Sequence, residues 1–182
     1  VTDDGFVYVA DSGNERIQKF TTDGAFLLEW KLPVKLEVFK LQHRRLVSLA
    51  TDSHGTIYVV MAGPFSCGVQ KFDPDGTLLE GWGEIGDGDG QFNAPTDIAI
   101  DNDDFVYIVD NTNHRIQKFT SEGEFLLKWG TPGSGEGEFV YPMGIAVDHS
   151  GRVYVTDFGD PVAGEWAMDD FFYYMGGSTD YN

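Results

Sequence analysis

Short apolar runs follow one another along the chain, and none of them has the spacing of a helix. VYVAD at 7–11 and VYIVD at 106–110 are rich in β-branched and aromatic residues, which is typical of strands. RIQKF at 115–119 predicts a further strand, with its Ile and Phe on one face. In TTDGAF, DPDGTL and SEGEF a glycine follows an acidic residue, as the positive φ of a tight hairpin turn requires. The pattern therefore predicts an all-β fold.

The same pattern returns several times. GFVYVADSGNERIQKF at 5–20 is repeated as DFVYIVDNTNHRIQKF at 104–119, with looser copies beginning at GTIYVV and GRVYVTD. One tyrosine of the pattern recurs at intervals of 47 to 50 residues, a period found in solenoids, propellers and arrays. Each unit reads as an antiparallel meander of four strands, for example PTDIAID, VYIVD, RIQKF and FLLKW. Because one meander cannot bury both of its faces, we expect the units to stack as the blades of a β-propeller. The recurring tyrosines are Tyr8, Tyr58, Tyr107 and Tyr154.

The succession P-x-x-I-A-x-D, V-Y-V-x-D, N-x-R-I-Q-K-F, D-G and W-G resembles the NHL repeat, whose propellers commonly have six blades. The resemblance implies a propeller domain over 1–159 that contains about four repeats. Four repeats are too few for six blades, so we expect a part of a six-bladed type of ring or an incomplete one. The alternatives are a fragment, a split propeller that a second chain or a homo-oligomer completes, and an unusually small ring. The units span about 1–30, 49–83, 92–130 and 139–159.

Two segments depart from the repeat. Residues 31–48 contain no glycine and are rich in lysine and arginine, where the other units have glycine-rich connections. They are either a true insertion or a frame-shifted segment. Residues 160–182 form a divergent, aromatic C-terminal segment. The chain also starts in the middle of the pattern, which predicts a truncated or processed protein.

A polar cluster between the second and third strands of a unit, such as Asp110, Asn113 and Arg115, looks at first like a catalytic site. It occurs in more than one unit, however, which suits architecture better than a single active site. We interpret Asp and Asn as bracing the turn through backbone N–H groups, and Arg as reaching an acidic neighbour. His114 aligns with Glu15 and is expected to be a solvated loop residue. The residues interpreted as structural are Asp11, Asn14, Arg16, Asp110, Asn113, Arg115 and Asp157, and the binding residues stay unknown.

Carboxylates supply the candidates for a metal site. EIGDGDGQ at 84–91 resembles a calcium loop, but it lacks the spacing of an EF-hand, and the matching GTPGSGEG has no Asp. Three further Asp residues end corresponding inner strands and could line a central channel. His54 and His149 lie in equivalent turns, and zinc would require such turns to converge. We expect no cofactor, with calcium or zinc as the alternative. The metal candidates are Asp87, Asp89, Asp52, Asp101 and Asp148.

No pattern of a catalytic nucleophile or of a phosphate-binding loop is present in the sequence. Cys67 has neither a local base nor a basic environment that would favour its thiolate, so it is interpreted as a buried or incidental thiol. We therefore predict no catalytic residue.

Charge narrows the set of partners. With 30 acidic and 12 basic residues the net charge is −18, which would repel nucleic acid. No apolar run is long enough to predict a membrane span, and an extracellular or envelope location is favoured. The leading hypothesis is a non-enzymatic scaffold that binds a protein, peptide or glycan. The alternatives are a metal-dependent lyase or hydrolase that uses the central channel, and a structural repeat module of a larger surface protein.

Overall fold

The computed structural model describes residues 5–32, 45–64 and 66–159. In these ranges the strands form separate antiparallel sheets whose members follow chain order, with one short parallel pair between two of the sheets. Two sheets have four strands each, which confirms the all-β prediction and the predicted meanders. The predicted insertion lies largely outside the described residues, and the aromatic C-terminal segment lies entirely outside them.

The sheets are the blades, numbered here in chain order. The first blade has three described strands, the second and third have four, and the fourth has two. Their strands are β1 (Phe6–Asp11), β2 (Arg16–Thr21) and β3 (Phe26–Lys31); β4 (Arg45–Thr51), β5 (Ile57–Ala62), β6 (Gly68–Phe72) and β7 (Leu78–Trp82); β10 (Pro95–Ile100), β11 (Val106–Asp110), β12 (Arg115–Phe119) and β13 (Phe125–Trp129); and β14 (Pro142–Val147) and β15 (Val153–Asp157). The short parallel strands are β8 (Glu84–Ile85) and β9 (Gln91–Phe92).

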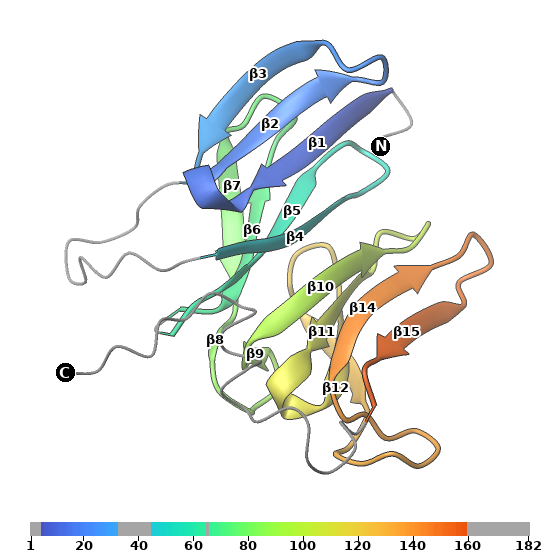
Figure 1. Cartoon of the computed structure of the whole chain (residues 1–182). Coiled ribbons are helices and arrows are strands. Elements are labelled where there is room, and N and C mark those ends of the chain that lie inside the picture. The colour runs from blue at the N-terminus through green and yellow to red at the C-terminus, as the bar shows by residue number, and fades with distance from the viewer. Residues whose placement is uncertain (1–4, 33–44, 65, 160–182) are drawn as a thin grey trace, which may run out of the picture.

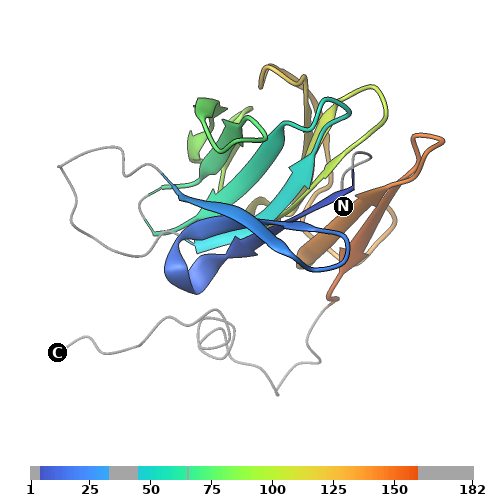
Figure 2. The ribbon, with the colours of Figure 1, turned by 90° about the horizontal axis from the view of Figure 1, so that it is seen from above.

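The blades stack in chain order, as Figure 1 shows from the blue β1–β3 to the orange β14 and β15. The view from above shows the same succession of sheets (Figure 2). Contacts join β1 to β4, β4 to β10 and β10 to β14, so each blade packs on the next one along the chain. This is the arrangement of a β-propeller, in which β4, β10 and β14 are the innermost strands of their blades.

Apolar side chains fill the spaces between neighbouring blades. Tyr58 and Val60 of β5 pack with Ile108 and Phe119 of the third blade, and all four are almost fully buried. The prediction that Ile and Phe of RIQKF share one face is wrong, because Ile116 packs on the opposite side, toward the fourth blade. Side chains three positions apart in a strand point to opposite faces, and both faces of a central blade are buried.

A tryptophan from one blade covers the hairpin glycine of the next. Trp30 lies over Gly76 and Trp82 lies over Gly123, so closely that an added Cβ would come within 2.6 Å of the indole in both cases. Both glycines have positive φ, near 88° and 84°. Gly24 holds the same place in the first blade, and no described residue lies within 4 Å of the Cβ that it would carry. Within the described ranges, therefore, no tryptophan covers this glycine.

The inner strands share a β-bulge near their start, which identifies equivalent positions. Register shifts occur between Leu46 and Ser48 in β4 and between Pro95 and Asp97 in β10, and β14 has the same shift. Because β4 begins at Arg45, residues 45–48 belong to the inner strand of the second blade and are not part of a separate segment. The described residues contain no helix that is long and apolar enough to cross a membrane.

Candidate functional site

The polar cluster of the third blade lies where β11 ends. A single 3-10 turn, η2 (Asn111–Asn113), leads to His114 in the left-handed conformation, and β12 starts at the next residue. The buried carboxylate of Asp110 accepts hydrogen bonds from Arg115 Nε at 2.7 Å and from Asn113 Nδ2 at 2.9 Å. Gln117 Nε2 adds a third at 3.1 Å. The turn residues thus converge on one charged group that is removed from water.

Arg115 also holds the glycine-rich link between the second and third blades, which we define as residues 83–94. Its Nη1 donates to the carbonyl of Asp87 at 2.7 Å, and its Nη2 donates to the carbonyls of Gly88 and Gln91 at 2.8 and 3.0 Å. The backbone N–H of Asn93 donates to Asp110 at 2.7 Å. One ion pair therefore fixes the path of a link that has no strong secondary structure of its own.

Burial raises the pKa of the Asp110 carboxyl, against the lowering effect of hydrogen bonds from Asn93, Asn113 and Arg115. Its charge thus depends on these donors, because a buried carboxylate without partners is strongly disfavoured.

The first blade carries the same cluster, and no described link contacts it. Arg16 Nε donates to Asp11 at 2.7 Å, and Asn14 and Gln18 donate to the same carboxylate at 3.0 and 3.1 Å. Hydrogen bonds from Arg16 and Asn14 lower the pKa of Asp11. Side-chain exposure is 29% for Arg16 and 21% for Asp11, against 8% and 0% for Arg115 and Asp110. The first cluster is formed but open to solvent.

The other two blades show what the Asp position does. Asp157 accepts hydrogen bonds from the backbone of Val140 and Tyr141, in the link that enters the fourth blade. In the second blade the position is occupied by Met61, and there the side-chain oxygen of Gln70 is buried without a hydrogen-bond partner among the described residues. In the third and fourth blades, this Asp thus accepts hydrogen bonds from the backbone of the link that leads into its own blade.

The three Asp residues that end inner strands are all bonded within tight turns. Asp52 Oδ1 accepts the backbone N–H groups of His54 and Thr56 at 2.9 and 2.8 Å. Asp101 and Asp148 make the same pair of bonds in their turns. The second oxygen of each carboxylate accepts the hydroxyl of the recurring tyrosine. These pairs are Tyr58 with Asp52 at 3.1 Å, Tyr107 with Asp101 at 2.8 Å, and Tyr154 with Asp148 at 3.1 Å.

Stability should fall at alkaline pH because of two of these tyrosines. Burial raises the pKa of Tyr58 and Tyr107 above 10, and the adjacent Asp carboxylates add to the shift. The folded chain therefore keeps two protons that the unfolded chain releases near pH 10, so the contribution of these two tyrosines to stability is fully present below that pH and declines above it. Urea unfolding from about pH 9 to pH 12 measures the decline. The double variant Tyr58→Phe, Tyr107→Phe should flatten it, and an unchanged slope would contradict this origin.

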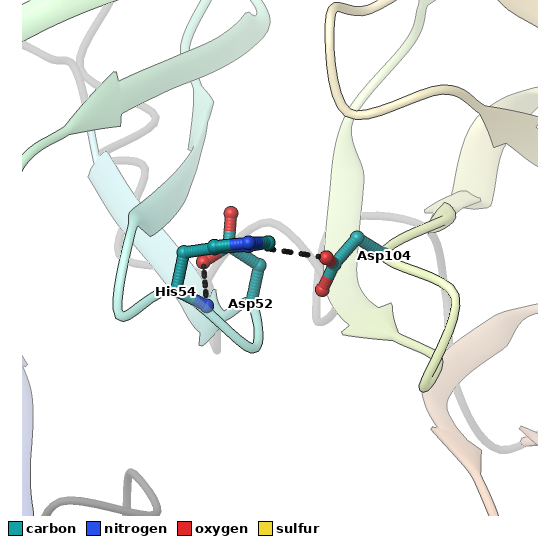
Figure 3. Close-up of side chains that lie close together, drawn as sticks. All are labelled: Asp52, His54 and Asp104. Atoms are coloured by element: carbon teal, nitrogen blue, oxygen red, sulfur yellow. Dashed lines mark hydrogen bonds and ion pairs between the residues drawn. The ribbon is translucent and has the colours of Figure 1, made fainter.

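Asp52, His54 and Asp104 come together where a turn of the second blade meets a turn of the third (Figure 3). One ligand atom from each lies within 4.8 Å of the others, and within the described ranges no further such group of His, Cys, Asp or Glu is found. His54 Nδ1 is 3.3 Å from Asp104 Oδ2, and the backbone N–H of Ser53 donates to Asp104 Oδ1 at 2.9 Å. The group includes one predicted metal candidate, Asp52, and none of the other four.

Asp104 stands in a backbone position that favours glycine. Its φ is 61°, and the equivalent turns of the second and fourth blades have Gly55 and Gly151 with φ near 80°. Because it bonds Ser53 across the blade boundary, the side chain of Asp104 ties two neighbouring turns together. The sequence pattern did not single out this residue.

Asp97 was likewise missed, although it connects three inner strands. Its Oδ1 accepts Ser48 Oγ of β4 at 2.6 Å, and its Oδ2 accepts the backbone N–H of Ile145 of β14 at 2.8 Å. Ser48, Asp97 and Gly144 are at equivalent bulge positions, so the two polar contacts of Asp97 lie at one level of the stack. Comparing residues one repeat period apart would have found this connection.

The remaining candidates are engaged in local contacts. His114 was expected to be solvated, but its ring is half-buried and Nδ1 lies 2.8 Å from the carbonyl of Val140, because the next link crosses the turn. Asp89 pairs with Lys128 at 2.5 Å, and the side chain of Asp87 projects from the exposed part of its link. Cys67 is buried, with its thiol 3.7 Å from the carbonyl of Gly63.

Comparison with solved structures supports the fold. A streptogramin B lyase is 18% identical, with 90% of this chain covering 54% of that one at a TM-score of 0.60. A virginiamycin B lyase from Staphylococcus aureus is also 18% identical, with 90% and 55% covered and a TM-score of 0.59. A protein of unknown function from Bacteroides caccae is 15% identical, with 86% and 51% covered and a TM-score of 0.57. The chain thus spans about half the length of these structures. At such identities the likeness shows the fold alone.

At the level of sequence, no curated protein matches the chain. The NHL repeat model matches residues 1–20 and 92–119. These residues include β1 and most of β2 in the first blade, and β10, β11 and β12 in the third. The matched segments lie in two of the stacked blades, so the first and third blades of this β-propeller fold carry NHL repeats.

Proposed function

We propose that the chain is a binding scaffold, whose links between blades present a rigid surface to a protein, peptide or glycan. The observation that carries this proposal is the set of hydrogen bonds that Arg115 donates to the 83–94 link. Arg115 binds three carbonyls of the link, while the residues Ile85, Asp87 and Asp89 of the same link are exposed.

A loop that is fixed before binding loses little conformational entropy when a ligand arrives, so more of the contact energy appears as affinity. Ile85 is 45% exposed and lies among acidic side chains, which gives an apolar contact with a charged rim. The net charge of −18 favours basic or neutral ligands over acidic ones. The repeated polar residues are engaged in holding the blades and links, so they support a scaffold more than a reaction.

Arrays of basic and neutral peptides, proteins and glycans should therefore yield a ligand for the purified chain. Ile85→Ser should weaken its binding about tenfold, since a buried aliphatic contact at an interface is worth that order of energy. Leu79→Ser is the matched control, because Leu79 is similarly exposed on the outer strand β7. Arrays without a ligand, together with turnover in a panel of hydrolase and lyase substrates, would reverse the proposal.

A second candidate function is that of a metal-dependent lyase or hydrolase. It is favoured by the Asp52, His54 and Asp104 group, which has the ligand types that zinc takes. Against it, the carboxylate oxygens of Asp52 and Asp104 already accept hydrogen bonds from turn residues. Elemental analysis of the purified chain and of His54→Ala decides the matter. One zinc per chain that is lost in the variant would support it, and equal metal content in both would remove it.

A further inference from the structure

We propose that Asp52, His54 and Asp104 bind one divalent transition-metal ion, with zinc as the best fit, and that the ion joins the second blade to the third. The proposed role is structural: the ion holds two turns together and takes part in no reaction. The inference therefore goes beyond the scaffold function and does not depend on it. It also differs from the second candidate function, in which the metal is catalytic.

Two turns depart from the repeat at the place where they meet. We define the inner turns as residues 52–55, 101–104 and 148–151, each of which follows the innermost strand of its blade. Of these three turns, only that of the second blade has a histidine as its third residue, and only that of the third blade has an aspartate as its fourth, where the others have glycine. These two residues, His54 and Asp104, face each other across the blade boundary, with Nδ1 3.3 Å from Oδ2. The two exceptions thus form one contact.

The three side chains offer ligand atoms at a spacing that one ion can span. One ligand atom of each lies within 4.8 Å of the others (Figure 3). Tetrahedral zinc ligands at bond lengths of about 2.0–2.1 Å stand about 3.3 Å apart, which is the separation of His54 Nδ1 from Asp104 Oδ2. The side chain of His54 is 78% exposed, so its imidazole can turn toward Asp52 without leaving a packed position. Small side-chain rotations therefore suffice to place all three ligands around an ion.

Hydrogen bonds from the turns orient the two carboxylates and leave each of them acceptor capacity. Asp52 Oδ2 accepts the Tyr58 hydroxyl at 3.1 Å, and Asp104 Oδ1 accepts the backbone N–H of Ser53 at 2.9 Å. An ionised carboxylate has about four lone-pair sites. Carboxylates that ligate metals are commonly hydrogen-bonded in this way, which fixes their direction. Ligands fixed by the turns suit an ion that holds those turns together.

Ser53 does not make the group a hydrolytic triad. Its Oγ lies 3.1 Å from His54 Nδ1, the same nitrogen that Asp104 approaches. In a Ser-His-Asp triad the hydroxyl and the carboxylate contact opposite nitrogens of the imidazole. Metal ligation is therefore the chemistry that the three side chains can perform together.

The ligand types select the ion. An imidazole nitrogen with two carboxylates suits zinc and its neighbours, whereas calcium takes six to eight oxygen ligands. The boundary between the third and fourth blades offers a comparison. There Asn102 Nδ2 donates to the carbonyl of His149 at 3.1 Å, and no group of possible metal ligands is found among the described residues of those turns. The ion would thus join one pair of blades and not the next.

Calorimetric titration of zinc chloride into the metal-free full chain tests the site, with excess Mg²⁺ present to occupy unspecific acidic groups. One zinc ion per chain should bind. His54→Asn and Asp104→Gly should each weaken zinc binding by more than about tenfold, because even a residue that only orients a ligand contributes that much. Asp104→Gly should stay folded, since glycine suits the φ of 61° at this position. The matched controls, which should bind zinc like the parent chain, are His149→Asn and Asp103→Asn, at exposed positions of the inner turns.

Thermal unfolding tests whether the ion joins the blades. At a zinc concentration about a hundredfold above the Kd, the midpoint temperature of the parent chain should rise by about 5–10 °C, and that of the two ligand variants should hardly change. Near-UV circular dichroism without metal checks that the variants are folded. Absence of a stoichiometric site, equal zinc affinity in the parent chain and the ligand variants, or binding without a rise in the midpoint would overturn the proposal. Turnover that depends on zinc would also overturn it, in favour of a catalytic metal. Array binding in the presence of a chelator reports on the scaffold function separately.

Discussion

Arg115→Met should lower the free energy of unfolding by about 3–5 kcal/mol, because it leaves Asp110 as a buried charge without its cationic partner. The exposed fractions of the two side chains are 8% and 0%. The substitution also removes the donors to three carbonyls of the 83–94 link. Urea unfolding followed by tryptophan fluorescence measures the change, with an unaltered dependence on urea as the sign that only stability has changed.

Arg16→Met is the internal control for this experiment. The ion pair of Arg16 with Asp11 has the same geometry, but it is open to solvent and holds no described link. Pairs in water contribute little to stability, so this variant should unfold close to the parent chain. If both variants lost the same free energy of unfolding, the hydrogen bonds from Arg115 to the link would have no energetic role.

Phe119→Ala should cost about 3–5 kcal/mol of unfolding free energy, because it opens a cavity in the core between the second and third blades. The Phe119 ring is completely buried, and its centroid lies 5.7 Å from that of Phe92 and 5.9 Å from that of Trp82. Thermal unfolding followed by circular dichroism provides a second measure beside urea. The loss should appear as a lower midpoint temperature.

The matched variant is Phe20→Ala, since Phe20 holds the same position in the first blade. It is only half-buried, because no described blade covers that face. We expect a clearly smaller loss than for Phe119→Ala. A comparable loss in both would show that the first blade is packed as tightly as the third.

The repeat made the fold predictable. Strands follow from apolar periodicity, and the turn glycines from their acidic neighbours, because these features act over a few residues. The four-strand meander could be predicted from the order of the segments alone. The prediction that Ile116 and Phe119 lie on the same face of the sheet was wrong, since the pattern does not show that both faces of a blade are covered.

The candidate sites were less predictable, because their contacts join different units. Recurrence suggested that the Asp110 and Arg115 cluster is architectural, but not that its arginine grips link carbonyls 24 to 28 residues earlier. Ser53 meets Asp104 across 51 residues and Ser48 meets Asp97 across 49. Both separations are close to the repeat period, so aligning the units would have brought these pairs together. The role of Asp104 would still not have been predicted, because it depends on the position of this residue in the folded turn.

Among the described residues each blade packs mainly on its neighbours along the chain, which makes this part of the molecule a short one-dimensional array. In such an array cooperativity is carried by the interfaces, so a unit with one neighbour opens more easily than a unit with two. The strand β11, which is buried throughout, and β5, which is buried except at Ala62, would then report the global opening in hydrogen exchange, whereas β3, whose Phe26 and Leu27 are exposed, would exchange through local fraying.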